Sequence, residues 1–233
     1  YQVYRALVRA KVALLRAEQL QGAARQQAVQ QGSHYLRLAE QFIQPRHPWL
    51  GLAHGLSGSG KSHLALYIAS QTGAVRLRSD VERKRLHGLD RTQRGGAAAG
   101  LYSAEATQRT FARLAELART LIAAGFAVIV DATFLHRPQR ATFAAIATEL
   151  GVRRIILSIS AELATLVSRL KARASDPNEV SDANLAVLES QLKTQEPLTA
   201  DELADTITLN AERLPAISEL VEEIERRAQT PAQ

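Results

Sequence analysis

Short apolar runs alternate with segments of helical period along most of this chain. Five runs predict strands, at residues 49–53, 74–78, 126–131, 154–160 and 204–209. The run at 126–131 (FAVIVD) is apolar up to its last residue, which is typical of a central strand covered on both faces of a parallel sheet. Helical spacing predicts helices at residues 63–69, 81–86, 103–124, 138–150, 161–174, 181–196 and 215–227. This alternation predicts an α/β fold, a doubly wound five-stranded parallel sheet with helices on both faces.

The first 48 residues precede this pattern and predict a helical extension. Apolar spacing predicts helices over residues 1–20 and 33–44, with a Gln-rich interruption between them. The sequence PRHP then forms a stiff linker before the first predicted strand. We therefore predict two parts, an N-terminal helical segment at residues 1–48 and an α/β domain at residues 49–233.

The composition limits the classes of protein that fit. The chain has no cysteine, so it holds neither disulfides nor a cysteine-based zinc site. No apolar run approaches the ~20 residues needed to cross a bilayer, and a cytoplasmic location is expected. A formal net charge of +6 favours anionic ligands, without by itself arguing for nucleic acid. His54, His63 and His136 lack the spacing of a metal site, and each is expected at a surface or core position. The chain has no methionine and starts with Tyr1, which indicates a processed product or a fragment.

A phosphate-binding loop follows the first predicted strand. Residues 55–62 read GLSGSGKS, which matches the pattern GxxxxGK[ST], and helical period begins directly afterwards. The glycines let backbone N–H groups converge on phosphate oxygens at the N-terminus of the next helix. Lys61 is expected to reach the β- and γ-phosphates of ATP, and the Ser62 hydroxyl to bind Mg²⁺. The expected nucleotide-binding residues are Gly55, Ser57, Gly58, Ser59, Gly60, Lys61, Ser62 and His63.

Two aspartates, Asp80 and Asp131, follow the second and third predicted strands. Ligands of such sheets bind beyond the carboxyl ends of the strands, so both should meet the phosphate loop at one edge. Asp80 is the candidate catalytic base and a candidate substrate contact; the alternative is an N-cap for the helix that begins at Val81. Asp131 is the candidate metal ligand beside Ser62; the alternative is an acid that hydrogen-bonds to loop backbone. Thr133 is expected to assist Asp131.

Arginines supply the positive charge that stabilises a transferring phosphoryl group. Arg169 and Arg173 lie four residues apart on one predicted helix, so both guanidinium groups can reach the same ligand. We expect them to act as catalytic lid residues; the alternative is a solvated basic face. Arg83, one turn after Asp80, is a candidate contact for an anionic substrate. The Gly-rich basic loop at residues 87–100 either contacts substrate or lies on the surface.

Together these motifs resemble the polynucleotide-kinase-like group of P-loop kinases, which includes zeta toxins and gluconate-kinase-like enzymes. The similarity lies in GLSGSGKS, in RSDVERKRL at residues 78–86, in VIVDATFL at 128–135 and in RLKAR at 169–173. More closely, the chain resembles the C-terminal ATP-binding domain of bacterial bifunctional aminoglycoside phosphotransferase/ATP-binding proteins, with YRALVRAKVALLR near the N-terminus and SDANLAVLESQLKTQEPL after the lid. This resemblance implies that the N-terminal helices are the end of a preceding phosphotransferase-like domain.

The resemblance also implies roles for individual residues. Asp80 falls on the aspartate that accepts the acceptor-hydroxyl proton in polynucleotide 5′-kinases, Arg83 on a substrate-phosphate arginine, and Arg169 or Arg173 on the lid arginine. The chain is therefore expected to be an ATP- and Mg²⁺-dependent kinase that phosphorylates a hydroxyl, of a nucleic-acid 5′ end or another anionic molecule. Only 5% of the residues are aromatic, which offers little platform for stacking bases. The alternative is a regulatory ATPase module that controls the adjacent phosphotransferase-like domain, with Asp80 serving as a cap.

Overall fold

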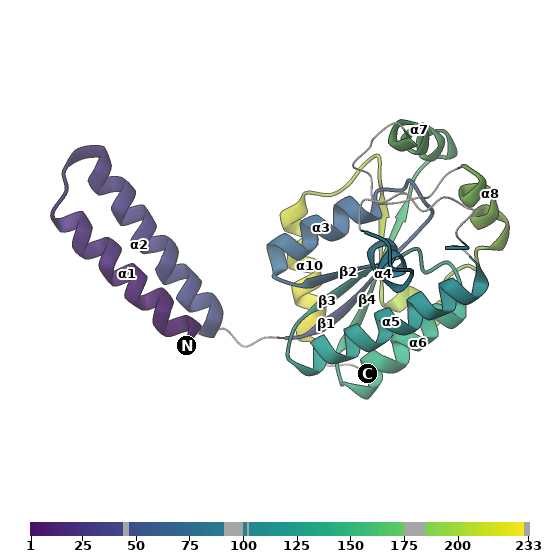
Figure 1. Cartoon of the computed structure of the whole chain (residues 1–233), viewed down its shortest axis with the longest axis horizontal. Helices are drawn as coiled ribbons and strands as arrows, with labels where there is room; N and C mark the ends of the chain where they lie inside the picture. Colours follow the sequence, from purple (N-terminus) through teal and green to yellow (C-terminus); the bar gives the residue numbers. More distant parts are fainter. Residues whose placement is uncertain (44–46, 91–99, 102, 175–184, 231–233) are drawn as a thin grey trace. The chain divides into compact units, whose positions relative to one another are not determined.

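The computed structural model describes residues 1–43, 47–90, 100–101, 103–174 and 185–230. The chain divides into two compact units, Tyr1–Arg46 and His47–Gln233. Figure 1 labels the helices and strands of both units. None of the helices in the described ranges combines the length and the hydropathy that crossing a membrane requires.

The first unit is a hairpin of two helices, α1 (Gln2–Glu18) and α2 (Gly22–Ile43). The buried face of α1 consists of the small residues Ala6, Ala10, Ala13 and Ala17. Their spacing of three and four residues places them on one side of the helix, where α2 packs closely. The predicted break between the two helices is too long. Because glutamine is a good helix former, the Gln-rich stretch continues α2, which begins at Gly22.

The second unit contains a sheet of five parallel strands. The strands are β1 (Trp49–His54), β2 (Val75–Arg78), β3 (Val128–Asp131), β4 (Arg153–Ser160) and β5 (Thr206–Asn210). Their order across the sheet is β2-β3-β1-β4-β5, and every neighbouring pair is parallel. The predicted α/β fold with a five-stranded parallel sheet is therefore confirmed.

Eight helices of the described residues accompany this sheet. They are α3 (Lys61–Thr72), α4 (Ser79–Leu86), α5 (Ala104–Ala123), α6 (Arg137–Glu149), α7 (Leu163–Ala174), α8 (Leu185–Thr194), α9 (Ala200–Ala204) and α10 (Ile217–Gln229). The short helix α9 was not predicted. It is fixed by a capping box, in which Thr199 and Glu202 satisfy each other's backbone N–H groups.

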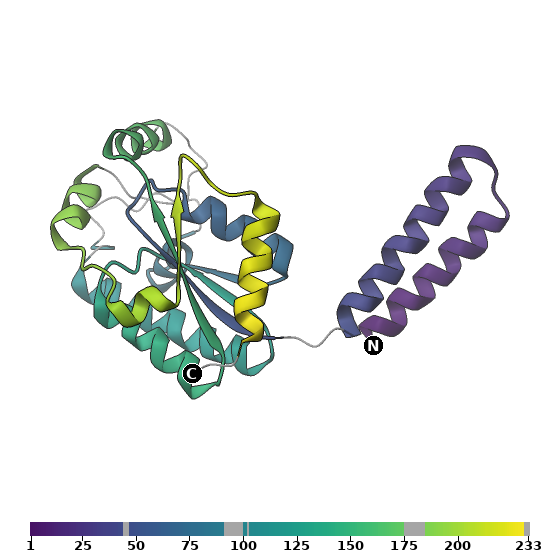
Figure 2. The same ribbon diagram turned by 180° about the vertical axis from the view of Figure 1, so that it is seen from behind.

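The two faces of the sheet carry separate apolar cores. Leu50 and Leu52 point to the face covered by α5 and α6, whereas Trp49 and Ile129 point to the face covered by α3 and α10. Figures 1 and 2 show these helix pairs on opposite sides of the strands. This alternation follows from the two-residue period of a strand. With the sheet held on both faces, the carboxyl ends of β1, β2 and β3 form one fixed edge.

Candidate functional site

The phosphate loop lies at the carboxyl end of β1 and leads directly into α3. Gly55 has φ +139°, and a Cβ atom there would lie 2.3 Å from the carbonyl oxygen of Ile159, so only glycine fits. Gly60, with φ 99°, is the N-cap of α3. The Gly55 N–H donates to the Thr133 carbonyl oxygen at 3.1 Å, which ties the loop to the segment after β3. The loop therefore has the backbone conformation that its glycines predict.

Lys61 and Ser62 form the first turn of α3. The buried Lys61 ammonium donates to the carbonyl oxygen of Leu56 in the same loop, at 2.6 Å. The Ser62 hydroxyl donates to Oδ1 of Asp131 at 3.0 Å. The two candidate metal ligands, predicted from separate motifs, therefore touch each other. His63 follows them on the exposed side of α3.

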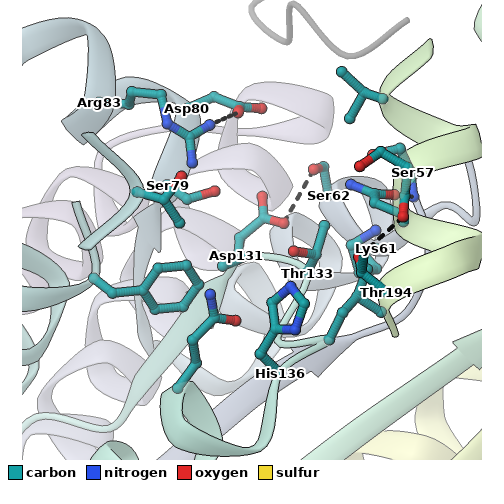
Figure 3. Close-up of a pocket in the computed structure, with 18 of the residues that line it drawn as sticks. Ser57, Lys61, Ser62, Ser79, Asp80, Arg83, Asp131, Thr133, His136 and Thr194 are labelled. Atoms are coloured by element: carbon teal, nitrogen blue, oxygen red, sulfur yellow. Dashed lines mark hydrogen bonds and ion pairs between the residues drawn. The ribbon is translucent and has the colours of Figure 1, made fainter. Parts of the chain in front are cut away.

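A pocket of about 260 Å³ opens beside this contact. Figure 3 shows the Ser62–Asp131 pair between Lys61 and Ser57 on one side and the Asp80–Arg83 pair on the other. The lining comes from the phosphate loop and the start of α3, from α4 and α5, from the end of β3 and the segment after it, from the start of α6, and from α8. The lining residues are Ser57, Gly58, Lys61, Ser62, Ser79, Asp80, Arg83, Thr107, Phe111, Asp131, Ala132, Thr133, Leu135, His136, Gln139, Val187, Ser190, Gln191 and Thr194.

Asp80 and Arg83 lie on α4 and both line the pocket. An Arg83 Nη1 atom is 3.5 Å from Asp80 Oδ1. Helix α4 begins at Ser79 with Arg78 as its N-cap, so Asp80 belongs to the first turn and is not the cap. The predicted alternative role of Asp80, as the N-cap, is therefore wrong. An acid in the first turn still favours the helix by its charge.

Asp131 is buried, and each carboxylate oxygen has its own partner. Oδ1 accepts from Ser62, while Oδ2 accepts from Arg76 of β2, through Nε at 3.1 Å and Nη2 at 2.5 Å. The alternative prediction, that Asp131 bonds to loop backbone, is not what these contacts show. Thr133 lines the pocket two residues further on.

Helix α7, which carries the two predicted lid arginines, packs against the phosphate loop. Arg169 Nη1 lies 3.3 Å from the carbonyl oxygen of Gly58 and 3.4 Å from that of Ser59. A Cβ atom at Gly58 would lie 3.0 Å from the Leu166 carbonyl oxygen, so this glycine permits the close approach of α7. Arg173 is in the last turn of α7, and its side chain lies outside the described residues, as do residues 91–99 of the basic loop.

Helix α8 contributes pocket residues that were not predicted as site residues. The Gln191 side-chain oxygen accepts a hydrogen bond from the Ser57 N–H at 2.9 Å, 134 residues away in sequence. The end of α8 is anchored beside the third strand, where the Glu196 N–H donates to the Leu135 carbonyl oxygen at 2.9 Å and the Glu196 carboxylate accepts from the Arg137 N–H. Helix α8 thus joins the phosphate loop to the segment that carries Thr133 and His136.

The histidines differ from one another. His54, at the end of β1, pairs through Nδ1 with the Ser158 hydroxyl at 3.0 Å. Burial lowers the pKa of His54 to about 4, and the positive charges of Arg140 and Lys61 act in the same direction. His54 is therefore neutral at pH 7. His136 lines the pocket and is half-buried, whereas His63 is exposed on α3.

The donor atoms at the centre of the pocket suit Mg²⁺. A serine hydroxyl and a carboxylate offer the hard oxygen ligands that this ion prefers. Within the described ranges, no group of three or more His, Cys, Asp or Glu side chains could hold a metal ion by itself. A magnesium ion here would depend on ligands that the protein does not supply, which phosphate oxygens provide in P-loop proteins.

The parallel sheet with a phosphate loop after its first strand defines a P-loop protein with the kinase type of α/β fold. Residues 50–198 match the family model described as an AAA domain (AAA_33), and the chain belongs to that family. An uncharacterised protein of Mycobacterium tuberculosis, Rv2004c, is 31% identical over 190 residues, which are 81% of this chain and 37% of the relative. An uncharacterised protein of Mycobacterium bovis, Mb2027c, matches equally well. The chain thus spans well under half the length of these curated relatives.

Solved structures share the fold at low sequence identity. A putative kinase from Chloroflexus aurantiacus is 18% identical, with TM-score 0.58 and coverage of 78% of this chain and 98% of that one. An APS kinase of M. tuberculosis, in complex with AMPPNP and APS, is 18% identical, with TM-score 0.55 and coverage of 80% and 100%. A sugar kinase from Janibacter is 21% identical, with TM-score 0.54 and coverage of 77% and 94%. These likenesses show the fold, and the narrower resemblance to polynucleotide kinases and zeta toxins stays a prediction.

Proposed function

We propose that this chain is a kinase that uses ATP and Mg²⁺ to phosphorylate a hydroxyl group. The observation that carries the proposal is the pocket that collects the phosphate loop, the Ser62–Asp131 pair and Asp80. Phosphoryl transfer requires a phosphate cradle, a metal site, a group that accepts the hydroxyl proton, and positive charge. Each requirement has a residue in or beside the pocket. The sugar kinase, the putative kinase and the APS kinase that share this fold support the proposal.

In the proposed reaction, Lys61 and the backbone N–H groups of the loop bind the phosphates. Arg169, together with Arg173, stabilises the charge on the transferring group. Ser62 and Asp131 would hold Mg²⁺, which neutralises charge on the β- and γ-phosphates when it is bound. Asp80 orients the acceptor hydroxyl and accepts its proton.

The acceptor side of the pocket supports a small hydroxylated molecule with a negative charge. Arg83 provides a positive charge there, and Phe111 is the one Phe, Tyr or Trp among the described lining residues. The Gln139 side-chain oxygen is buried without a hydrogen-bond partner in the described part of the chain. A buried acceptor of this kind favours a ligand that donates a hydrogen bond, such as a hydroxyl. A nucleic-acid 5′-hydroxyl remains the second acceptor class to test, because one aromatic ring offers little stacking.

Transfer of ³²P from γ-labelled ATP with Mg²⁺ tests the proposal. The acceptors are 5′-hydroxyl DNA and RNA oligonucleotides, sugars and sugar acids, nucleotide sugars and a metabolite extract. Label should pass to one acceptor class, and Asp80→Asn should reduce transfer roughly 100-fold or more while nucleotide affinity stays unchanged. Asp201→Asn, an exposed acid in the first turn of α9, is the matched control.

Two results would contradict this proposal in different ways. Phosphate release that no acceptor alters, and that Asp80→Asn leaves intact, would favour the regulatory ATPase module. If the wild-type protein binds no nucleotide, both the kinase and the regulatory ATPase are contradicted. Because binding and transfer are measured separately, the outcome also shows which half of the proposal fails.

A further inference from the structure

The carboxylate of Asp131 is shared between a pocket residue and an arginine outside the pocket. Oδ1 accepts from Ser62, which lines the pocket. Oδ2 accepts two hydrogen bonds from Arg76, which is not among the lining residues, and Arg78 Nε lies 3.8 Å from the same oxygen. One oxygen of the candidate metal ligand is therefore directed to the pocket, and the other is held by an arginine.

The register of the sheet explains this arrangement. Arg78 lies opposite Asp131 and Arg76 opposite Ile129 in the parallel pair β2–β3. Because side chains alternate along a strand, Arg76 and Arg78 share a face, whereas Leu77 joins the core on the other face. The Arg76 side chain is 14% exposed and that of Asp131 4%, so the ion pair is largely removed from solvent. Two N–H groups of the Arg76 guanidinium on the single oxygen Oδ2 hold that oxygen in place as well as compensating the charge of the carboxylate.

We propose that Arg76 is a positioning residue that prevents Asp131 from binding a divalent cation on its own. Arg76 and a metal ion compete for the same negative charge, and Oδ2 is already occupied. Among the described residues, no cluster of acids or histidines could replace the metal ligand that Arg76 occupies. The cation then binds only together with phosphate oxygens, so it enters as part of the metal–nucleotide complex. This step rests on the proposed function, because it takes a nucleoside triphosphate as the ligand of the loop.

A purely structural role is the rival explanation for Arg76. The ion pair joins the edge strand β2 to β3, and its removal would lower stability whatever happens at the metal site. A stability measurement cannot separate the two roles. Measuring the binding of a metal ion in the absence of nucleotide separates them, because removing a purely structural arginine would leave the metal affinity unchanged.

The experiment measures Mn²⁺ binding to the full chain without nucleotide, from the electron paramagnetic resonance signal of free Mn²⁺. Arg76→Gln should bind Mn²⁺ at least about tenfold more tightly than wild type, because the carboxylate loses its compensating charge. Adding Asp131→Asn to Arg76→Gln should abolish the gain. Arg154→Gln is the matched control, since Arg154 of β4 donates through Nε and Nη2 to one oxygen of Asp205, away from the pocket.

The inference is overturned if folded Arg76→Gln binds Mn²⁺ no more tightly than wild type, or if the gain survives Asp131→Asn. If Arg76→Gln does not fold, Arg76→Lys is measured in the same way. Lysine keeps the charge and loses the paired donation to Oδ2, so a gain of a few-fold is expected and no gain refutes the inference. Titration with a fluorescent ATP analogue runs in parallel. If wild-type protein does not bind the ATP analogue, the proposed function is contradicted. The Mn²⁺ affinities alone decide the role of Arg76.

Discussion

Arg140 of α6 holds together three segments around the site, and its removal should be one of the most damaging substitutions in the second unit. The side chain is fully buried, and its guanidinium makes five hydrogen bonds. Two go to the Glu202 carboxylate, at 2.7 and 3.1 Å. The other three go to the carbonyl oxygens of Phe134, Glu196 and Pro197. All five N–H donors of the guanidinium are thereby satisfied.

Replacing Arg140 with methionine keeps the apolar stem and leaves the buried Glu202 carboxylate without its cation. Breaking a buried ion pair in this way costs about 3–5 kcal/mol. In a domain of this size, 1 kcal/mol shifts Tm by about 2–4 °C, so Arg140→Met should lower Tm by roughly 10 °C. Adding Glu202→Gln should recover part of the loss, because it removes the unpaired charge and glutamine retains the capping box.

The chain's single tryptophan supplies the assay. Trp49 is buried in β1, so its fluorescence follows unfolding of the second unit. Arg119→Met is the control, because Arg119 of α5 also pairs with a glutamate, Glu149, but on the exposed surface. Its Tm should match wild type. If Arg140→Met shifts Tm no more than Arg119→Met does, the assignment of Arg140 as the anchor of these segments is wrong.

Three further results are expected. The pKa of His54 falls from 6.5 to about 4 on folding, so the unfolded state binds the extra proton as the pH drops from 7 toward 4 and the folded state loses stability. About 2 kcal/mol of the free energy of unfolding should be lost by pH 5. Urea unfolding of His54→Gln should lack this part of the pH dependence. Gln191→Ala should bind a fluorescent ATP analogue about 2–10 times more tightly than wild type, because it frees the Ser57 N–H of the phosphate loop. The control Gln195→Ala, at an exposed position, should bind the analogue as wild type does. Weaker binding by Gln191→Ala would refute this expectation. Gln139→Leu should raise the acceptor KM and leave the ATP KM unchanged; an unchanged acceptor KM would exclude Gln139 from the acceptor side.

The sequence was sufficient for the sheet and for the residues at its edge. The apolar runs that end in the phosphate loop, at Arg78 and at Asp131 each form a strand, and the carboxyl ends of parallel strands meet at one edge of the sheet. The predicted Gln-rich break is wrong, because glutamine suits a helix and the stretch is part of α2.

Contacts between distant segments could not be predicted in the same way. Arg76 looks like a solvated residue of an edge strand, and only the β2–β3 register places it beside Asp131. Arg140 occupies a helix with ordinary polar positions, and its partner Glu202 is 62 residues away. Gln191 lies in a segment that carries the family resemblance, but nothing in that segment indicates a contact with the phosphate loop. Burial of a polar side chain depends on a partner that periodicity does not identify, so these residues emerge only from the assembled fold.

The same contacts imply that the loop and the anchor of α8 are energetically connected. Arg140 bonds to the carbonyl oxygens of Glu196 and Pro197, directly after α8, and Gln191 of α8 bonds to the phosphate loop. Loosening the anchor should therefore release the Gln191 contact and change nucleotide affinity, although Arg140 does not line the pocket. In a double-mutant cycle, Gln191→Ala should then have a smaller effect in an Arg140→Met background than in wild type. If the effects of the two substitutions on nucleotide affinity are strictly additive, the Arg140 contacts are not coupled to the phosphate loop through α8. Arg140 then contributes to stability alone.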